Sequence, residues 1–443
     1  MKKKLNLFDL ISLGVGTIIG AGVFSMMGYG IAYTGRSITI ALFISMFLVL
    51  MQAIRYPILA SVFDVEGGMY GLNSITNPRV CVGFNAASDL FFKIGSQSVT
   101  AIAITQYLTV VFPGLAQYQR LVAAVILTVA YVIAALGDKF AAVVQNVMVI
   151  LMYVALGIFV VYGFIRMDPA AYQSESMFPN GITGLMMAVA LMSYTCNGFQ
   201  YVINMGKSAE NPKRNIPLAF CLSAFIAAAL YALIGFAATH VFSYKEIVGM
   251  NLGDIAKMMM PSGLHMFFVV GGALFALCTS LLGGISSGYR PIQCSAKDGW
   301  FPKVLGEESK NGIPYVLILL YVICLVPILL GLQLNDLVTM SLIPSGILVI
   351  ISNMFAMKIP NRYAKEWKES GIKVSGSLYR VLLWLSNIAS AILVGYCFLS
   401  NNLKVSTIIV TLFIFAYGFI RSKSSAIVIH TQQNISVQKD VEG

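Results

Sequence analysis

Residues 14–24 read Gly14-Val15-Gly16-Thr17-Ile18-Ile19-Gly20-Ala21-Gly22-Val23-Phe24, and this glycine-rich stretch lies inside the first long apolar segment of the chain. Glycine is costly in a helix interior, although membrane helices also use it to pack two backbones closely. The spacing of Gly16 and Gly20, four residues apart, fits such a packing face. The alternative is an unwound stretch at mid-membrane, whose freed backbone N–H and C=O groups need a polar partner.

A similar interruption lies in the sixth apolar segment, at Tyr194-Thr195-Cys196-Asn197-Gly198-Phe199-Gln200. Segments 1 and 6 are five apart, and because five is odd, a repeat of five helices would be inverted across the membrane. Paired breaks at corresponding positions of two such halves indicate a transporter with a binding site at the membrane midplane. Half-helix N-termini suit a carboxylate and freed carbonyls suit an ammonium group, and an amino acid carries one of each.

The composition places this pattern in a lipid bilayer. The 443 residues are 58% hydrophobic and only 11% charged, whereas a soluble protein carries about a quarter charged residues. These values exclude a cytosolic enzyme, a disordered protein and a secreted disulfide scaffold. The formal net charge of +11 would suggest a nucleic-acid partner on a soluble chain. Here it indicates orientation, because cytoplasmic loops concentrate Lys and Arg.

Hydropathy predicts an all-α membrane protein with twelve transmembrane helices, since a spanning helix needs about 20 mostly apolar residues. The predicted helices are 8–34, 37–63, 83–112, 121–137, 140–165, 182–205, 216–240, 266–288, 315–334, 337–357, 381–400 and 405–420. With both termini cytoplasmic, 22 of the 29 Lys and Arg residues face inside, 6 face outside and 1 lies within a helix. Losing one helix would destroy this segregation, so we expect a multi-pass protein of the plasma membrane.

This topology predicts a single transmembrane domain over residues 1–421. Residues 8–165 form the first repeat, 182–357 the inverted second repeat, and 381–420 two additional C-terminal helices. The last residues, 422–443, are expected to be a short, disordered cytoplasmic tail.

Four motifs, in the same order along the chain, resemble those of the amino acid–polyamine–organocation (APC) superfamily of permeases. They are Gly16–Phe24, Glu66-Gly67-Gly68-Met69-Tyr70, Glu210-Asn211-Pro212-Lys213-Arg214-Asn215-Ile216-Pro217, and Arg290 followed by Ala296-Lys297-Asp298-Gly299-Trp300-Phe301-Pro302. The resemblance implies the 5+5 inverted-repeat (LeuT-like) fold with broken helices 1 and 6, and a substrate held between helices 1, 3, 6, 8 and 10. The chain departs from the family at Lys207-Ser208, where a Glu-Glu pair is common, and at Gln200, which replaces a possible charge.

The resemblance also implies a set of substrate contacts. Carried over position by position, the N–H groups of Ala21 and Gly22 would receive the substrate carboxylate. The carbonyls of Ile18, Tyr194 and Thr195 would receive its ammonium group. Tyr194 stands where the family places an aromatic gate, although on the residues alone it fits equally well as a filler of the bundle core.

Asp89 and Lys93 are the obvious ionisable pair within the predicted helices. Their spacing allows a salt bridge that only neutralises both groups, but a charge inside a membrane is by default a functional candidate. The resemblance places Phe92, Lys93 and Gln97 toward the distal part of the substrate, so polar or acidic side chains should be favoured over basic ones. If Asp89 and Lys93 instead satisfy one another, the pocket is apolar and small or aliphatic amino acids bind.

The coupling ion has two interpretations. Family members that are driven by protons, or are independent of sodium, often carry a Lys in the middle of helix 5, where this chain has Met152. Thr279 and Ser280 match the hydroxyl pair that binds sodium in sodium-coupled relatives, and with the carbonyls of Gly16 and Ile19 they would supply four oxygen ligands for Na⁺. In the alternative, both hydroxyls bond to their own helix backbone, and the protein is an ion-independent exchanger.

The function favoured by the sequence is a secondary active transporter for amino acids. An enzyme is not expected, because no Ser/His/Asp or metal-ligand arrangement occurs, and no ATP-binding motif indicates a nucleotide. We expect no cofactor apart from a coupling Na⁺, no nucleic-acid partner, and no partner subunit, because no unpaired cysteine lies in a predicted outer loop. A sensor that keeps the permease fold without transport remains an alternative.

Overall fold

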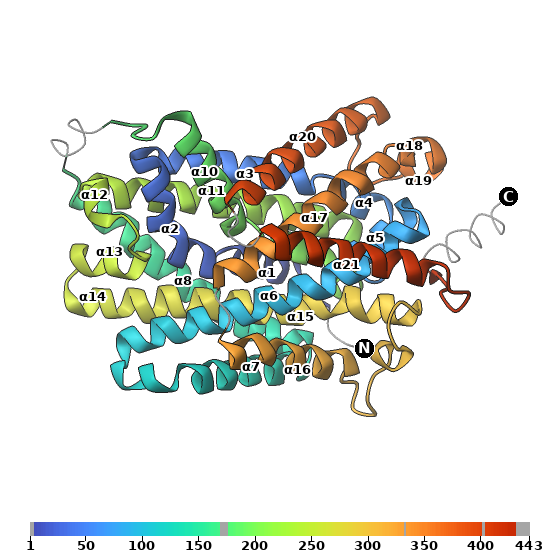
Figure 1. Ribbon diagram of the computed structural model, residues 1–443, viewed down its shortest axis with the longest axis horizontal. Helices are drawn as coiled ribbons and strands as arrows, with labels where there is room; N and C mark the ends of the chain where they lie inside the picture. The colour runs from blue at the N-terminus through green and yellow to red at the C-terminus, as the bar shows by residue number, and fades with distance from the viewer. Residues whose placement is uncertain (1–3, 169–175, 332–333, 401–403, 431–443) are drawn as a thin grey trace.

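The computed structural model describes residues 4–168, 176–331, 334–400 and 404–430. Within these ranges the chain is helical and has no β-strand, only two isolated β-bridges, which confirms the predicted all-α fold. Most of the long helices lie along the long axis of the molecule (Figure 1). Such a bundle suits a membrane, because helices satisfy their backbone polar groups internally.

The helices of the first predicted repeat begin with a broken one. They are α1 (Leu7–Ile18), α2 (Ala21–Thr34), α3 (Ile38–Ala53), α4 (Arg55–Val62), α5 (Met69–Thr76), α6 (Arg79–Val111), α7 (Gln119–Ala135) and α8 (Asp138–Ile165). The predicted helix 37–63 is therefore divided, at Ile54, into α3 and α4. The third predicted helix begins earlier than expected, at Arg79.

The second predicted repeat also begins with a broken helix. Its elements are α10 (Gly181–Thr195), the 3₁₀ helix η3 (Phe199–Ser208), α11 (Pro212–Val241), α12 (Tyr244–Ile247), α13 (Leu252–Met259), α14 (Ser262–Phe267), the π-helix η4 (Phe268–Leu274), α15 (Phe275–Lys297), α16 (Tyr315–Leu330) and α17 (Leu334–Ala356). Two short helices, α18 (Ile359–Arg362) and α19 (Ala364–Lys368), precede α20 (Gly376–Ser400) and α21 (Lys404–Ser422).

In the described ranges, ten helical stretches are long and apolar enough to cross a membrane. Helix α16 is apolar but has only 16 residues, and α6, with 33 residues, carries the charges of Arg79, Asp89 and Lys93. Helices occupy all twelve predicted segments. The chain is thus a multi-pass membrane protein, and the count of twelve crossings stays a prediction.

The broken helices lie at the centre of the bundle. The apolar window of Leu7–Phe24 is 82% buried inside the protein, whereas that of Lys404–Ser422 is only 22% buried. Helix α1 packs against α8, α11, α15 and η3. The breaks are therefore buried inside the protein, whereas α21 lies at the surface of the bundle.

One end of the bundle, which we call the termini end, holds the start of α1, the end of α21 and the turn after α15, toward the right of Figure 1. Here Ile427 and Ile429, which follow α21, are only 4% and 9% exposed. The prediction of a disordered tail over 422–443 is therefore wrong for residues up to His430, because two buried isoleucines anchor them. Residues 431–443 lie outside the described ranges.

Candidate functional site

The break in the first helix is confirmed. Helix α1 ends at Ile18 and α2 begins at Ala21, with Ile19 in an extended conformation between them. Glycine is needed here because two other helices come very close. A Cβ on Gly20 would lie 2.5 Å from Cβ of Ser280 on α15, and a Cβ on Gly22 would lie 2.6 Å from Cα of Thr195 on α10.

The break in the sixth helix is also confirmed, between Thr195 and Phe199. Gly198 has a φ of +137°, which a side chain would strain, and a Cβ there would lie 2.3 Å from the carbonyl oxygen of Thr17. The Thr17 hydroxyl lies 3.1 Å from the Gly198 carbonyl oxygen, and it shares its single proton with the nearer carbonyls of Leu13 and Gly14 in its own helix. The two breaks thus touch each other directly, as a shared site requires. Beyond the break the chain continues as a 3₁₀ helix, a difference from the α-helix expected to Met205.

A cavity of about 40 Å³ lies between the breaks. Five of the predicted residues line it: Ile18, Gly22, Tyr194, Thr195 and Ser280. Phe92, which the resemblance places toward the distal part of the substrate, also lines it. The sequence analysis did not assign the remaining wall residues to the site. They are Thr17, Gly20, Ser96, Thr100, Asn197, Gly198, Gln200 and Tyr201.

The predicted carboxylate donors are the backbone amides at the start of α2. Ala21 and Gly22 are its first two residues, and the preceding Gly20 provides no side-chain cap. The first N–H groups of a helix have no partner within it, and the helix dipole makes this end partially positive. The start of α2 thus has the free N–H groups that an anion needs, and binding of the substrate carboxylate there stays a prediction.

The predicted ammonium acceptors share a neighbour that the sequence analysis missed. The Tyr231 hydroxyl, on α11, lies 2.9 Å from the carbonyl oxygen of Ile18 and 2.9 Å from that of Thr195. One hydroxyl has a single proton, so it can donate fully to only one of these two oxygens at a time. The only available signal was a tyrosine inside an apolar helix, whose hydroxyl needs a partner when buried.

Lys93 lies beside the cavity but not on its wall. The side chain is 3% exposed, and Nζ lies 3.7 Å from the ring centroid of Tyr201, a cation–π contact. No ion pair in the described ranges joins Lys93 to Asp89. Oδ2 of Asp89 is buried without a hydrogen-bond partner. The two groups therefore form no direct salt bridge, although each charge acts on the other. Which of the two pockets the sequence analysis describes correctly stays a prediction.

Gln97 is directed elsewhere. Its Oε1 accepts hydrogen bonds from the Tyr131 hydroxyl and, at 3.3 Å, from the Cys324 thiol. These partners belong to α7 and α16. Gln97 lines neither the 40 Å³ cavity nor the larger one described next, so the structure does not bring it together with the other predicted residues.

A second, larger cavity of about 110 Å³ borders the first. The two share four wall residues: Phe92, Asn197, Gln200 and Tyr201. The larger cavity lies among α3, α6, α17 and α20, and Asp89 and Lys93 both line it. A substrate whose charged groups occupy the small cavity would direct its side chain past Tyr201 toward these two charges.

The predicted sodium ligands are only partly assembled. The Thr279 hydroxyl lies 3.1 Å from the Gly16 carbonyl oxygen, while the Ser280 hydroxyl lies 3.4 Å from that of Thr17. The Thr279 hydroxyl also lies 2.8 Å from the Ala276 carbonyl of its own helix, as the alternative expects. Among the described residues, no hydrogen bond connects Ile19 to this group. The Thr279 hydroxyl thus hydrogen-bonds to carbonyl oxygens in this structure, and the sodium site stays a prediction.

Gln145, on α8, is a second residue that the sequence analysis missed. Its amide is 2% exposed, and neither its nitrogen nor its oxygen has a hydrogen-bond partner. A Cβ on Gly16 would lie 2.3 Å from Nε2 of Gln145. The resemblance to the family had pointed to Met152 as the position of the helix 5 Lys. Met152 lies two turns later on α8 and is part of the hydrophobic core. The α8 residue beside the predicted ion site is thus a neutral amide.

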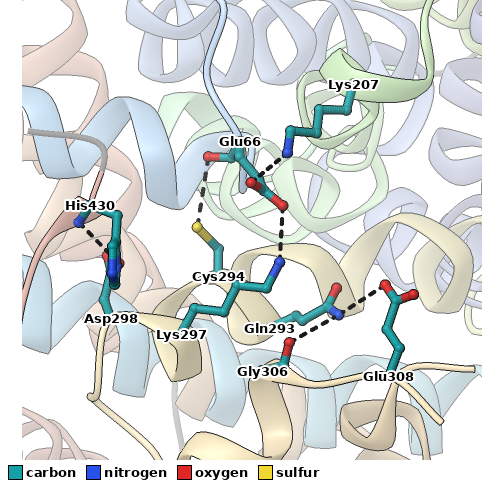
Figure 2. A network of polar contacts seen from close by, with 9 residues as sticks. All are labelled: Glu66, Lys207, Gln293, Cys294, Lys297, Asp298, Gly306, Glu308 and His430. Carbon is teal, nitrogen blue, oxygen red and sulfur yellow. Dashed lines mark hydrogen bonds and ion pairs between the residues drawn. The ribbon is translucent and has the colours of Figure 1, made fainter. Parts of the chain in front are cut away.

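At the termini end, ion pairs on Glu66 join the loop between α4 and α5 to η3 and α15, as shown in Figure 2. Its carboxylate lies 2.5 Å from Nζ of Lys207 on η3 and 3.1 Å from Nζ of Lys297 on α15. Partial burial raises the pKa of Glu66, but the hydrogen bonds and charges of these two lysines outweigh it and hold the pKa below its ordinary value. Lys207, a departure from the family pattern, therefore pairs with the acidic residue of another family motif.

Comparisons with known proteins agree with this geometry. Residues 5–435 match the family model described as amino acid permease. The branched-chain amino acid permease BcaP of Bacillus subtilis is 24% identical over 340 residues, which cover 71% of this chain and 72% of the relative. The vacuolar cationic amino acid transporter 4 of Arabidopsis thaliana is 26% identical over 342 residues, or 70% of this chain. Cationic amino acid transporter 4 of Mus musculus is 24% identical over 362 residues, or 76% of this chain.

The matched part spans 55% and 56% of the two cationic transporters. The family model, in contrast, covers almost the whole of this chain. The helical fold and the two breaks are those expected of this family. The chain belongs to the amino acid permease family, within the APC superfamily.

Proposed function

We propose that this protein is a secondary active transporter that moves amino acids across the plasma membrane by alternating access to the cavity between the two breaks. The observation that carries the proposal is the contact between Gly198 and Thr17, which joins the breaks around one enclosed site. The substrate carboxylate binds the N–H groups of Ala21 and Gly22. Its ammonium binds the carbonyls of Ile18, Tyr194 and Thr195.

The proposal also includes the number of membrane crossings and the arrangement of the helices as repeats. Twelve crossings with both termini cytoplasmic would place α1 to α8 and α10 to α17 as two inverted repeats, with α20 and α21 outside them. This arrangement is supported by helices in all twelve predicted segments and by breaks at the start of both repeats.

Counterflow of labelled amino acids into liposomes tests the proposal. A Gly22→Leu variant should insert normally and lose substrate binding, because the leucine side chain would collide with Thr195. Gly157→Leu is the matched control, since nothing lies within 4 Å of a Cβ there. Unchanged affinity in a folded Gly22→Leu protein would place the site elsewhere.

Side-chain preference is the second part of the proposal. Lys93 faces the larger cavity beside Tyr201 and has no ion-pair partner among the described residues. A basic side chain there would meet a like charge in a medium of low dielectric, so polar or acidic side chains are favoured, with Asp89 tempering the charge of Lys93. The names of the relatives mention branched-chain and cationic amino acids. They favour no single side chain for this protein.

Sodium coupling is the third part, and it rests on the oxygens of Gly16 and Thr279. Uptake should be faster in sodium than in choline buffer, and Thr279→Ala should remove the difference. Ser280→Ala should have the smaller effect, because its hydroxyl lies next to Thr17 instead. Equal uptake in both buffers, unaltered in both variants, would favour an ion-independent exchanger of small neutral amino acids.

A further inference from the structure

Residues 424–430, which we call the tail segment, return from the end of α21 onto the turn that follows α15. Asp298 of this turn holds the tail segment through both its backbone and its side chain. Its carbonyl oxygen accepts a hydrogen bond from the Val428 N–H at 3.0 Å. Its Oδ1 lies 3.2 Å from the backbone nitrogen of His430 and 2.7 Å from Nδ1 of the same residue (Figure 2). The Asp298 side chain is only 1% exposed, so the anchor is inside the protein.

Apolar contacts reinforce this anchor. Ile427 and Ile429 are 4% and 9% exposed, and they complete a small hydrophobic cluster. The other members of the cluster are Tyr70, Val82, Ala86, Cys294 and Trp300. Val428, between the two isoleucines, is 38% exposed and belongs to no such cluster. Burial thus alternates along residues 427–429, as in an extended segment with one face against the protein. A tail without a docking site would not bury two isoleucines in this way.

The side chain of Arg79, at the start of α6, fixes the path of the tail segment. Its Nη2 donates hydrogen bonds to the carbonyl oxygens of Ser424, at 2.5 Å, and Ile427, at 2.9 Å. Nη2 of Arg421 donates to the carbonyl of Gly299 in the turn itself, at 2.5 Å. Charged donors on main-chain acceptors are strong hydrogen bonds. The docked conformation is therefore specified by the backbone as well as by apolar burial.

The docking site is continuous with the Glu66 contacts at the termini end. Tyr70 donates a hydrogen bond to Oδ2 of Asp298 at 2.7 Å. On the last turn of α15, one and four residues before Asp298, Lys297 and Cys294 contact Glu66. Glu66 in turn holds Lys207 on η3, the second half of the broken helix 6. The contacts of Asp298 and those of Glu66, both drawn in Figure 2, thus meet at the end of α15, between the tail segment and η3.

We propose that the tail segment is a latch. Docked on Asp298, it holds the end of α15 against the Glu66 loop and keeps the termini end closed. When it is released, this end opens more readily and the buried face of α15 becomes accessible. The latch rests on the proposed transport function only in that opening of this end is taken as a step of transport. Its tests measure the accessibility of thiols, so they also apply to a protein that transports no substrate.

Two thiol reporters on α15 test the latch in the full-length protein in nanodiscs. The native Cys294 is 7% exposed and lies in the cluster under the tail segment. A Ser286→Cys variant places a second thiol two turns deeper, where Ser286 is 4% exposed and lines a separate cavity of about 20 Å³. Maleimide labelling is read at each position by peptide mass spectrometry. The exposed Cys221 serves as the internal reference.

Ile427→Ser should raise the labelling rate at both reporters by about tenfold or more, because it removes the burial of one isoleucine side chain. Val428→Ser, the matched control, should leave both rates unchanged. His430→Ala should raise them by a smaller factor, since it removes only the polar contact. Size-exclusion profiles and Cys221 labelling equal to those of the wild type exclude global unfolding.

Two outcomes would overturn the latch. If both rates stay at their wild-type values in Ile427→Ser, the tail segment holds nothing. If Cys294 reacts faster while the deeper reporter does not, the tail segment covers only its own footprint and does not control the closure.

Discussion

At the scale of single residues, the site depends on groups whose partners come from other helices. Lys93 is the clearest case, because its ammonium lies over the Tyr201 ring and has no ion-pair partner in the described part of the chain. A competition panel of glutamate, glutamine, serine, leucine and arginine should show arginine as the weakest competitor. Lys93→Met should raise the apparent affinity of arginine as a competitor by about tenfold or more, and tenfold corresponds to about 1.4 kcal/mol.

The control for this experiment is Gln97→Met, one helical turn away. Gln97 contacts Tyr131 and Cys324 and lines neither cavity, so its variant should keep the wild-type order of competitors. Strong competition by arginine in the wild type would refute the charge argument. An unaltered order in Lys93→Met would show that Lys93 only supports Tyr201.

At the scale of elements, the loop between α4 and α5 connects η3 to α15, because its Glu66 pairs with a lysine on each. Gly67 and Gly68 have φ values of +80° and +54°, and a Cβ on Gly68 would lie 2.3 Å from Oδ1 of Asn204. The two glycines let the loop approach η3 closely enough for Glu66 to reach Lys207. The Glu-Gly-Gly motif thus has a local physical reason that its sequence alone did not reveal.

The Glu66 ion pairs predict a dependence of stability on pH. Because the folded protein lowers the pKa of Glu66 below its ordinary value of 4.5, the pairs contribute fully above that value and are lost as the pH falls through the lowered pKa. Glu66→Gln should therefore lower the Tm at pH 7, with a difference from the wild type that shrinks in more acidic buffer. Glu246 is exposed on α12, and Glu246→Gln should change neither the Tm at pH 7 nor its dependence on pH. A difference independent of pH would mean that Glu66 acts through packing.

At the scale of the whole molecule, hydropathy and glycine spacing predicted the helices and both breaks, because these depend on local sequence. Features that depend on contacts between distant segments could not be predicted. Tyr231 and Gln145 gain their importance only when α11 and α8 are packed against α1. The docked tail has the same origin, since Ile427 and Ile429 resemble any apolar pair until Asp298 and Trp300 are beside them.

The Tyr231 hydroxyl has a consequence for molecules that carry the same charge as an amino acid. It brings one proton to two carbonyl oxygens, those of Ile18 and Thr195, each with two lone pairs. A primary ammonium brings three further N–H donors and can saturate these acceptors, whereas a trimethylammonium group has the charge and no donor. Glycine should therefore compete with the substrate and betaine should not, even though both are zwitterions. Equal inhibition by the two would show that the site recognises the positive charge and does not require its protons.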